Sequence, residues 1–132
     1  MDPDRLAALR RGYDRAPLLE SDVDPDPLVA FGVWFEEAAR AAEKGLLVEA
    51  NAVVFATADA DGAPSARTVL LKAFDARGFV VFTNYSSAKG RDIEANPRAA
   101  LLFPWHALDR QPRCRAGAGA AAAGREHRKQ RP

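Results

Sequence analysis

The most regular pattern of apolar and polar positions lies in residues 27–44, where apolar side chains recur every three or four residues. Charged side chains fill the positions between them, which predicts a helix that buries one face against a core. Asp26-Pro27 before this stretch and Gly45 after it are typical of a helix start and a helix end. The apolar positions are Leu28, Phe31, Phe35, Ala38 and Ala42.

Two shorter helices are predicted from residues that favour helix starts. Asp2 followed by Pro3 predicts one at the N-terminus, and residues 86–94 predict another, with a serine cap and an end before Pro97. Residues 16–27 are rich in proline and aspartate, so we expect a loop or arm across the surface there.

From Asn51 onward the apolar positions follow the pattern of strands. Short turns separate the first three runs, which implies antiparallel neighbours in a meander. The predicted strands are 53–57, 67–72, 79–83 and 98–103, with turns at 59–62 and 75–78. The predicted fold class is therefore α+β with a strand-rich antiparallel core, and its sheet must close or find a partner to protect its edges.

Composition narrows the class of protein. The chain has 132 residues, enough for one domain, and no apolar run near the roughly 20 residues that cross a membrane. A single cysteine, Cys114, excludes an internal disulfide framework and a multi-cysteine metal site. The acidic N-terminus lacks the apolar segment of a secretory signal, so we expect a cytoplasmic protein with no membrane partner.

The net charge of +1 is the sum of two unlike parts. Residues 112–132 contain five Arg, one Lys and one Glu, whereas residues 1–111 hold 13 basic and 17 acidic side chains. The segment 112–132 also has six Ala, three Gly and no large apolar side chain, so we expect it to be disordered. The order of its residues, a block of small residues followed by a charged block, is typical of the unselected sequence that a shifted reading frame gives. A basic tail can bind nucleic acid, but this signal is unspecific and we expect no such partner.

Two groups of cationic residues are candidates for anion binding. Arg67 and Lys72 stand at the two ends of the second strand, and strand alternation places them on opposite faces unless the strand twists or bulges. Lys89 follows two serines at a helix start, where backbone N–H groups, hydroxyls and an ammonium group favour a phosphate. One hypothesis is that Arg67 and Lys89 converge on one phosphate. The alternative is that Lys89 and Arg91 form a solvated helix face and Arg67 is a charge at a strand edge.

Other chemistry finds little support in the sequence. His106 lacks a neighbouring His or Cys, so we expect a structural histidine and no metal site. The chain contains none of the motifs G-x-G-x-x-G, P-loop and G-x-S-x-G, which leaves the corresponding nucleotide-binding and hydrolase mechanisms unsupported.

Six segments of the chain match one known pattern in order and spacing. They are 67–72 (RTVLLK), 78–85 (GFVVFTNY), 87–90 (SAKG) and 96–111 (NPRAALLFPWHALDRQ), with 10–13 (RRGY) and 26–27 (DP) upstream. Through these segments, residues 5–111 resemble the N-terminal half of the pyridoxamine 5′-phosphate oxidase family. The run 96–111 is the most specific of them.

The resemblance implies an antiparallel, Greek-key-like split β-barrel with N-terminal helices, here incomplete at the C-terminus. In the family this barrel binds FMN and forms a homodimer with two flavins at the interface. The family oxidises pyridoxamine or pyridoxine 5′-phosphate to pyridoxal 5′-phosphate. A hydride passes from the substrate C4′ to flavin N5, and O₂ then reoxidises the flavin to give H₂O₂. The implied organisation is an N-terminal helix and arm at 1–25, a partial FMN-binding domain at 26–111 and a basic tail at 112–132.

The resemblance also assigns roles to individual residues. Arg67 and Lys89 match residues at the FMN phosphate, and Lys72 matches a residue that also touches substrate. Arg10 and Tyr13 match an N-terminal segment that folds over bound substrate. The full set expected to contact FMN is Arg67, Thr68, Val69, Leu70, Leu71, Lys72, Phe82, Thr83, Lys89 and Gln111.

The chain departs from the family in two places. Ala88 stands where many members have Arg, which removes one cation from the phosphate site. After Gln111 the family continues with a further barrel strand, a Tyr, Arg and Ser set for the substrate phosphate, and a later Trp and Arg–His segment. We expect residues 112–132 to match none of this, as after a truncation or frameshift, and the barrel to be left with an exposed edge.

Three other functions stay open at this point. The chain could be a non-catalytic FMN-binding remnant, a related split-barrel flavin reductase, or a nucleic-acid binder through its tail. The reductase explains Pro104-Trp105-His106 less well than the oxidase does. FMN binding separates the flavin hypotheses from the nucleic-acid one, and peroxide production with pyridoxamine 5′-phosphate separates an oxidase from a remnant.

Overall fold

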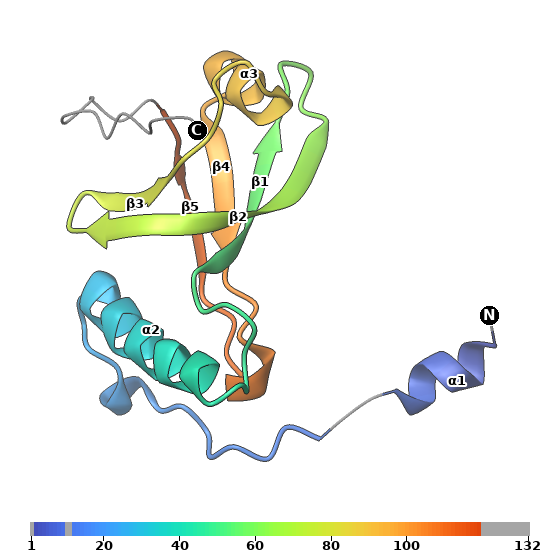
Figure 1. The fold of residues 1–132 in the computed structure, drawn as a ribbon, viewed down its shortest axis with the longest axis vertical. Helices are drawn as coiled ribbons and strands as arrows, with labels where there is room; N and C mark the ends of the chain where they lie inside the picture. The colour runs from blue at the N-terminus through green and yellow to red at the C-terminus, as the bar shows by residue number, and fades with distance from the viewer. Residues whose placement is uncertain (1, 10–11, 120–132) are drawn as a thin grey trace, which may run out of the picture.

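The computed structural model describes residues 2–9 and 12–119, which form an antiparallel sheet with helices at its two ends (Figure 1). The predicted α+β class is confirmed. Along the chain the elements are α1 (Pro3–Ala8), η1 (Glu20–Asp22), α2 (Pro27–Glu43), β1 (Ala52–Ala58), β2 (Pro64–Asp75), β3 (Gly78–Val81), α3 (Ala88–Ala95), β4 (Arg98–Leu102), η2 (His106–Leu108) and β5 (Arg113–Gly117).

The helices begin where the sequence predicts. The carboxylate of Asp26 accepts a hydrogen bond from the Leu28 backbone N–H at 2.9 Å, which caps α2, and Asp2 caps α1 in the same way. Ser87 is the N-cap of α3. No helix in the described part of the chain is long and apolar enough to cross a membrane.

The five strands lie in the order β3-β2-β1-β4-β5, and every neighbouring pair is antiparallel. β1 is the central strand, so Phe55 stands opposite Arg67 of β2 on one side and Leu101 of β4 on the other. Figure 1 shows the long β2 curving across the sheet, with α3 near one end of β1 and α2 near the other. The curvature lets one strand serve both the β1 pairing and the β3 hairpin.

A β-bulge interrupts β2 between Leu71 and Ala73, where its pairing with β3 shifts register. Lys72 is the extra residue. In a strand that paired regularly through Lys72, alternation from the buried Leu71 would carry Ala73 to the buried face, but the structure exposes Ala73 and turns Phe74 inward. The bulge therefore keeps Phe74 in the core at the cost of regular pairing.

The core is built from aromatic rings that α2 and the sheet share. The Phe31 ring of α2 lies 4.9 Å, centroid to centroid, from the rings of Phe74, Phe79 and Phe103. Phe103 and Trp105 are 1% exposed. The Trp105 indole N–H donates a hydrogen bond of 2.9 Å to the Ala50 carbonyl, so its one polar group is satisfied inside the core.

One expectation about the C-terminal segment is wrong. We expected all of residues 112–132 to be disordered, yet Arg113–Gly117 form β5 on the outer side of β4. The expectation rested on the lack of apolar side chains, but an edge strand is held by main-chain hydrogen bonds that any residue except proline can make. Residues 120–132 lie outside the described residues.

Candidate functional site

The turn before α3 brings polar groups together above the β1–β2 sheet. The Ser87 hydroxyl donates to the Asn84 carbonyl at 2.6 Å and accepts the Gly90 backbone N–H at 3.4 Å. Gly90 is buried against Tyr85, and a Cβ at position 90 would overlap with the Tyr85 carbonyl oxygen. Only glycine therefore allows this close approach between the helix and the turn.

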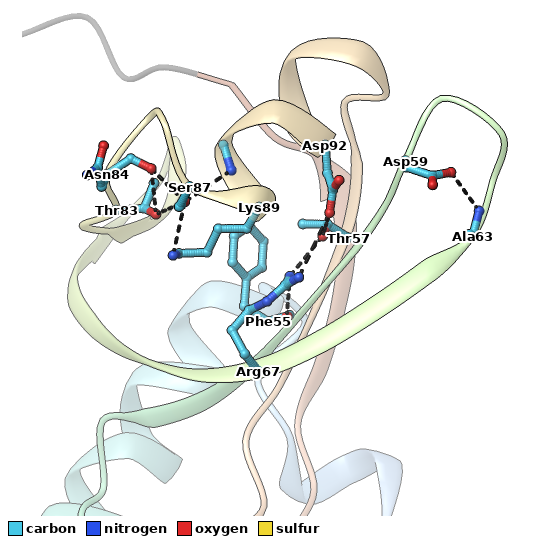
Figure 2. A network of polar contacts seen from close by, with 11 residues as sticks. Phe55, Thr57, Asp59, Ala63, Arg67, Thr83, Asn84, Ser87, Lys89 and Asp92 are labelled. Carbon is cyan, nitrogen blue, oxygen red and sulfur yellow. Dashed lines mark hydrogen bonds and ion pairs between the residues drawn. The ribbon is translucent and has the colours of Figure 1, made fainter.

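Arg67 of β2 lies beneath α3 and is held by β1 and α3 together (Figure 2). Its Nη1 donates to the Thr57 hydroxyl at 2.8 Å and to the Phe55 carbonyl at 3.1 Å. The same Thr57 hydroxyl donates to Oδ2 of Asp92 at 2.6 Å, and that oxygen lies 3.8 Å from Nη2 of Arg67. The guanidinium group is thus fixed in orientation while its side chain keeps 25% exposure.

Lys89 belongs to the first turn of α3, and its side chain extends into the region beneath the helix, where it is held by a different partner from those of Arg67 (Figure 2). Its Nζ donates to the Ser87 hydroxyl at 3.2 Å. Figure 2 shows Lys89 turned toward Ser87 and Arg67 turned toward Thr57 and Asp92. The two cations therefore flank one region under α3 without sharing a protein partner.

The expected flavin-contacting residues of β2 divide between its two faces. Arg67, Val69 and Leu71 are at least partly buried on the face that carries the core, as strand alternation predicts. Thr68 and Lys72 are exposed, and Leu70 is half-buried. The bulge at Lys72 lies just past the point where β2 leaves β1, so Arg67 and Lys72 stay on separate surfaces.

The other expected site residues lie around this region or away from it. Phe82 follows the end of β3 and is 73% exposed, and Thr83 has its hydroxyl 3.4 Å from that of Ser87. We expected both within the third strand, but β3 ends at Val81. Gln111 is exposed before β5. Tyr13 is 74% exposed on the arm, and Arg10 lies outside the described residues.

Sequence reasoning missed a second polar cluster that fixes the arm. Arg15 donates to the Leu108 carbonyl at 2.7 Å and to Glu37 of α2 at 2.8 Å. Glu37 also pairs with Arg110 at 3.4 Å, and the Arg110 guanidinium stacks over the Trp34 ring at 4.6 Å. This cluster ties the Tyr13-bearing arm to the segment that leads into Gln111.

Thr57 and Asp92 were also missed as partners of Arg67. Asp92 comes three residues after Lys89, so both share one face of α3, and Thr57 occupies an inward position of β1. These periodicities could have placed each side chain on the correct face. The pairing between Thr57 and Asp92 spans 35 residues of sequence and follows only from the fold.

No group of three His, Cys, Asp or Glu side chains within residues 2–9 and 12–119 is placed to hold a metal ion. The donors near α3 are instead an ammonium group, a guanidinium group, hydroxyls and backbone N–H groups. This is the chemistry that binds phosphate esters.

Comparison with known proteins identifies the family of the chain. A family model described as pyridoxamine 5′-phosphate oxidase matches residues 36–131. A pyridoxine/pyridoxamine 5′-phosphate oxidase of Rubrobacter xylanophilus is 61% identical over 114 residues, which cover 86% of this chain and 51% of that protein. The chain therefore spans about half the length of the curated relatives that it matches.

Two solved structures support the fold. PhzG from Burkholderia lata, crystallised with tetrahydrophenazine-1-carboxylic acid, matches with a TM-score of 0.65 and 25% identity over 76% of this chain and 49% of that chain. A pyridoxamine 5′-phosphate oxidase-related, FMN-binding protein from Nostoc punctiforme matches with a TM-score of 0.58 and 22% identity over 72% of this chain and 47% of that chain. The expected split-barrel fold is confirmed, as a five-stranded half-barrel with N-terminal helices.

The comparison also corrects one boundary. We expected the family pattern to end at Gln111, but the family model extends to residue 131, and β5 begins two residues after Gln111 as a further strand of the sheet. With the model covering most of the chain and the fold in agreement, the chain belongs to the pyridoxamine 5′-phosphate oxidase family.

Proposed function

We propose that the chain binds FMN, with the flavin phosphate beneath the start of α3. The observation that carries this proposal is the placement of Arg67 and Lys89 on two sides of one region under that helix (Figure 2). Within residues 2–9 and 12–119, no hydrogen bond uses the Nε–H of Arg67, and Lys89 is bound only by a neutral hydroxyl. Both cations therefore keep donors for an anion, and the residues present fit a phosphate monoester.

The function that follows is the oxidation of pyridoxamine or pyridoxine 5′-phosphate to pyridoxal 5′-phosphate, with O₂ as the acceptor. Family membership and identity to oxidases near 60% support it. FMN, when bound, supplies the two-electron redox chemistry. The protein's own residues bind the cofactor and the substrate and orient them toward each other.

Each expected site residue has a role in this proposal. Arg67 and Lys89 neutralise the cofactor phosphate, and the exposed Lys72 at the bulge offers its ammonium group to the substrate on the other surface of β2. Phe82 presents an exposed apolar ring beside Thr83 for the flavin. Tyr13, on the arm that Arg15 anchors, covers the substrate.

We further propose that two copies of the chain form a homodimer in the cytoplasm. The outer edge of β5 has no pairing strand among the described residues, and Phe82 and Tyr85 are large apolar side chains exposed near α3. A second copy would cover such surfaces, as exposed edges and apolar side chains favour association.

A second candidate function is FMN binding without turnover. The chain spans about half the length of its oxidase relatives, which favours this candidate. Two measurements separate the candidates. Flavin absorbance in the purified protein tests FMN binding, and H₂O₂ release on adding pyridoxamine 5′-phosphate tests turnover. Bound FMN without peroxide identifies the non-catalytic form, and absence of FMN contradicts both candidates.

A further inference from the structure

Arg67, the residue that the proposed function places at the FMN phosphate, is already beside an anion of its own chain. Oδ2 of Asp92 lies 3.8 Å from Nη2 of Arg67, and the two side chains are 15% and 25% exposed. Both groups are therefore shielded in part from water. Charges in such partly buried positions act on each other more strongly than charges at the surface do. A phosphate at Arg67 would lie close to this carboxylate.

The orientation of Arg67 does not depend on the charge of Asp92. Nη1 is fixed by the Phe55 carbonyl at 3.1 Å and the Thr57 hydroxyl at 2.8 Å, whereas the contact to Asp92 is too long for a hydrogen bond. Asp92 is itself held by the Thr57 hydroxyl at 2.6 Å. Thr57 is 3% exposed, so it places both groups from inside the sheet.

We propose that Asp92 is an internal counter-anion that sets the affinity of Arg67 for a phosphate monoester. The proposal rests on the proposed function and deepens it. Asp92 makes Arg67 one half of a neutral pair in the ligand-free protein, which lowers the cost of a partly buried guanidinium. On binding, the ligand phosphate must share Arg67 with that carboxylate, and repulsion between the two anions weakens the complex.

The change Asp92→Asn isolates this effect. The Asn side-chain oxygen can still accept the Thr57 hydroxyl, so the network under α3 persists while the negative charge is lost. We expect FMN to bind about three- to tenfold more tightly, because the variant removes one partly screened negative charge from beside the phosphate. Riboflavin lacks the phosphate, so its affinity should stay unchanged.

The experiment measures dissociation constants for FMN and riboflavin by quenching of flavin fluorescence at two salt concentrations. The matched control is Glu94→Gln, which removes one charge from an exposed position of the same helix. The gain in FMN affinity should be specific to Asp92→Asn and should shrink at high salt. Asp92→Gln, a second neutral variant, gives the same readout if Asp92→Asn does not fold.

Unchanged or weaker FMN binding by the neutral variants would overturn the proposal, as would an equal change in riboflavin binding or an equal gain in Glu94→Gln. Measurements on the unsubstituted protein distinguish failure of the proposed function from failure of the role proposed for Asp92. If that protein binds neither flavin, FMN binding is refuted and the role of Asp92 falls with it. If it binds FMN and the variants show no gain, only the role of Asp92 is refuted.

Discussion

Gly90 of α3 packs so closely against Tyr85 that a Cβ would overlap with the Tyr85 carbonyl oxygen. The turn before α3 and the first turn of the helix are thereby held in one arrangement. The Ser87 hydroxyl joins them, because it accepts hydrogen bonds from the Lys89 ammonium group and the Gly90 backbone N–H. The placement of a lysine in the proposed phosphate site thus depends on a residue with no side chain.

Replacing Gly90 with alanine should destabilise the protein and weaken FMN binding. The backbone at Tyr85 must move to admit the methyl group, and we expect a loss of about 1–3 kcal/mol in the free energy of unfolding. Urea denaturation measures the stability, and fluorescence quenching measures the flavin affinity.

The control is Gly32→Ala in the middle of α2, where the new Cβ would lie 3.8 Å from the Phe74 ring, an ordinary contact. Alanine is the better helix former, so this variant should gain about 0.5–1 kcal/mol. Equal effects from the two substitutions would contradict the role assigned to Gly90.

Trp105→Phe should destabilise the core through one lost hydrogen bond. The Trp105 indole donates to the Ala50 carbonyl at 2.9 Å, and both residues are buried. Removing the donor leaves that carbonyl without its partner, and we expect a loss of about 1–3 kcal/mol in chemical denaturation, in addition to the loss of ring contacts. The comparison variant is Trp34→Phe. Because the Trp34 ring is only half-buried, this variant should lower the free energy of unfolding by less than Trp105→Phe does. A larger loss from Trp34→Phe would contradict the prediction.

Glu37→Gln should loosen the arm. Glu37 is the shared partner of Arg15 and Arg110, at 2.8 and 3.4 Å, so neutralising it weakens both attachments. We expect faster tryptic cleavage after Arg15 with little change in the free energy of unfolding, since these ion pairs are partly exposed. Glu36→Gln, at the exposed neighbouring position, should leave the cleavage rate unchanged. Equal rates in both variants would show that Glu37 does not hold the arm.

Asp75 should titrate below its ordinary pKa of 3.8. The Arg77 side chain lowers the pKa of Asp75 by donating hydrogen bonds of 2.6–3.3 Å, and the Arg77 backbone N–H adds to this effect. Because the folded-state pKa is depressed, the stabilisation is present above the unfolded-state pKa and is lost as the pH falls through the folded-state pKa. Carboxyl NMR measures the titration, and Arg77→Ala should return the pKa toward 3.8. No upward movement in that variant would contradict the assignment.

The sequence predicted the parts of the fold that rest on local signals. The caps Asp26 and Ser87 begin α2 and α3, and the runs of apolar residues form β1, β2, β3 and β4. Strand β5 escaped prediction because the main-chain pairing with β4 leaves no mark on its side chains. An edge strand needs no apolar side chains to pair with its neighbour, so their absence in residues 113–117 did not exclude a strand.

The candidate site was predictable in its cations but not in their partners. Arg67 and Lys89 are visible as charges in a recognisable order along the chain. Thr57 and Asp92 join them only because α3 returns over β1, a contact between distant segments. Local sequence patterns cannot report which side chain meets which across such a distance.

The extra residue at the bulge of β2 separates what the core needs from what the outer surface of the strand displays. Leu71 and Phe74 both face inward, and the exposed Lys72 and Ala73 lie between them. Deleting Lys72 would restore regular alternation with Leu71 and Phe74 still inward, so the Phe74 ring would stay against Phe31 while the exposed ammonium group is lost. A relative of this protein that lacks this one residue should therefore keep the fold but have no lysine to offer a substrate on that surface.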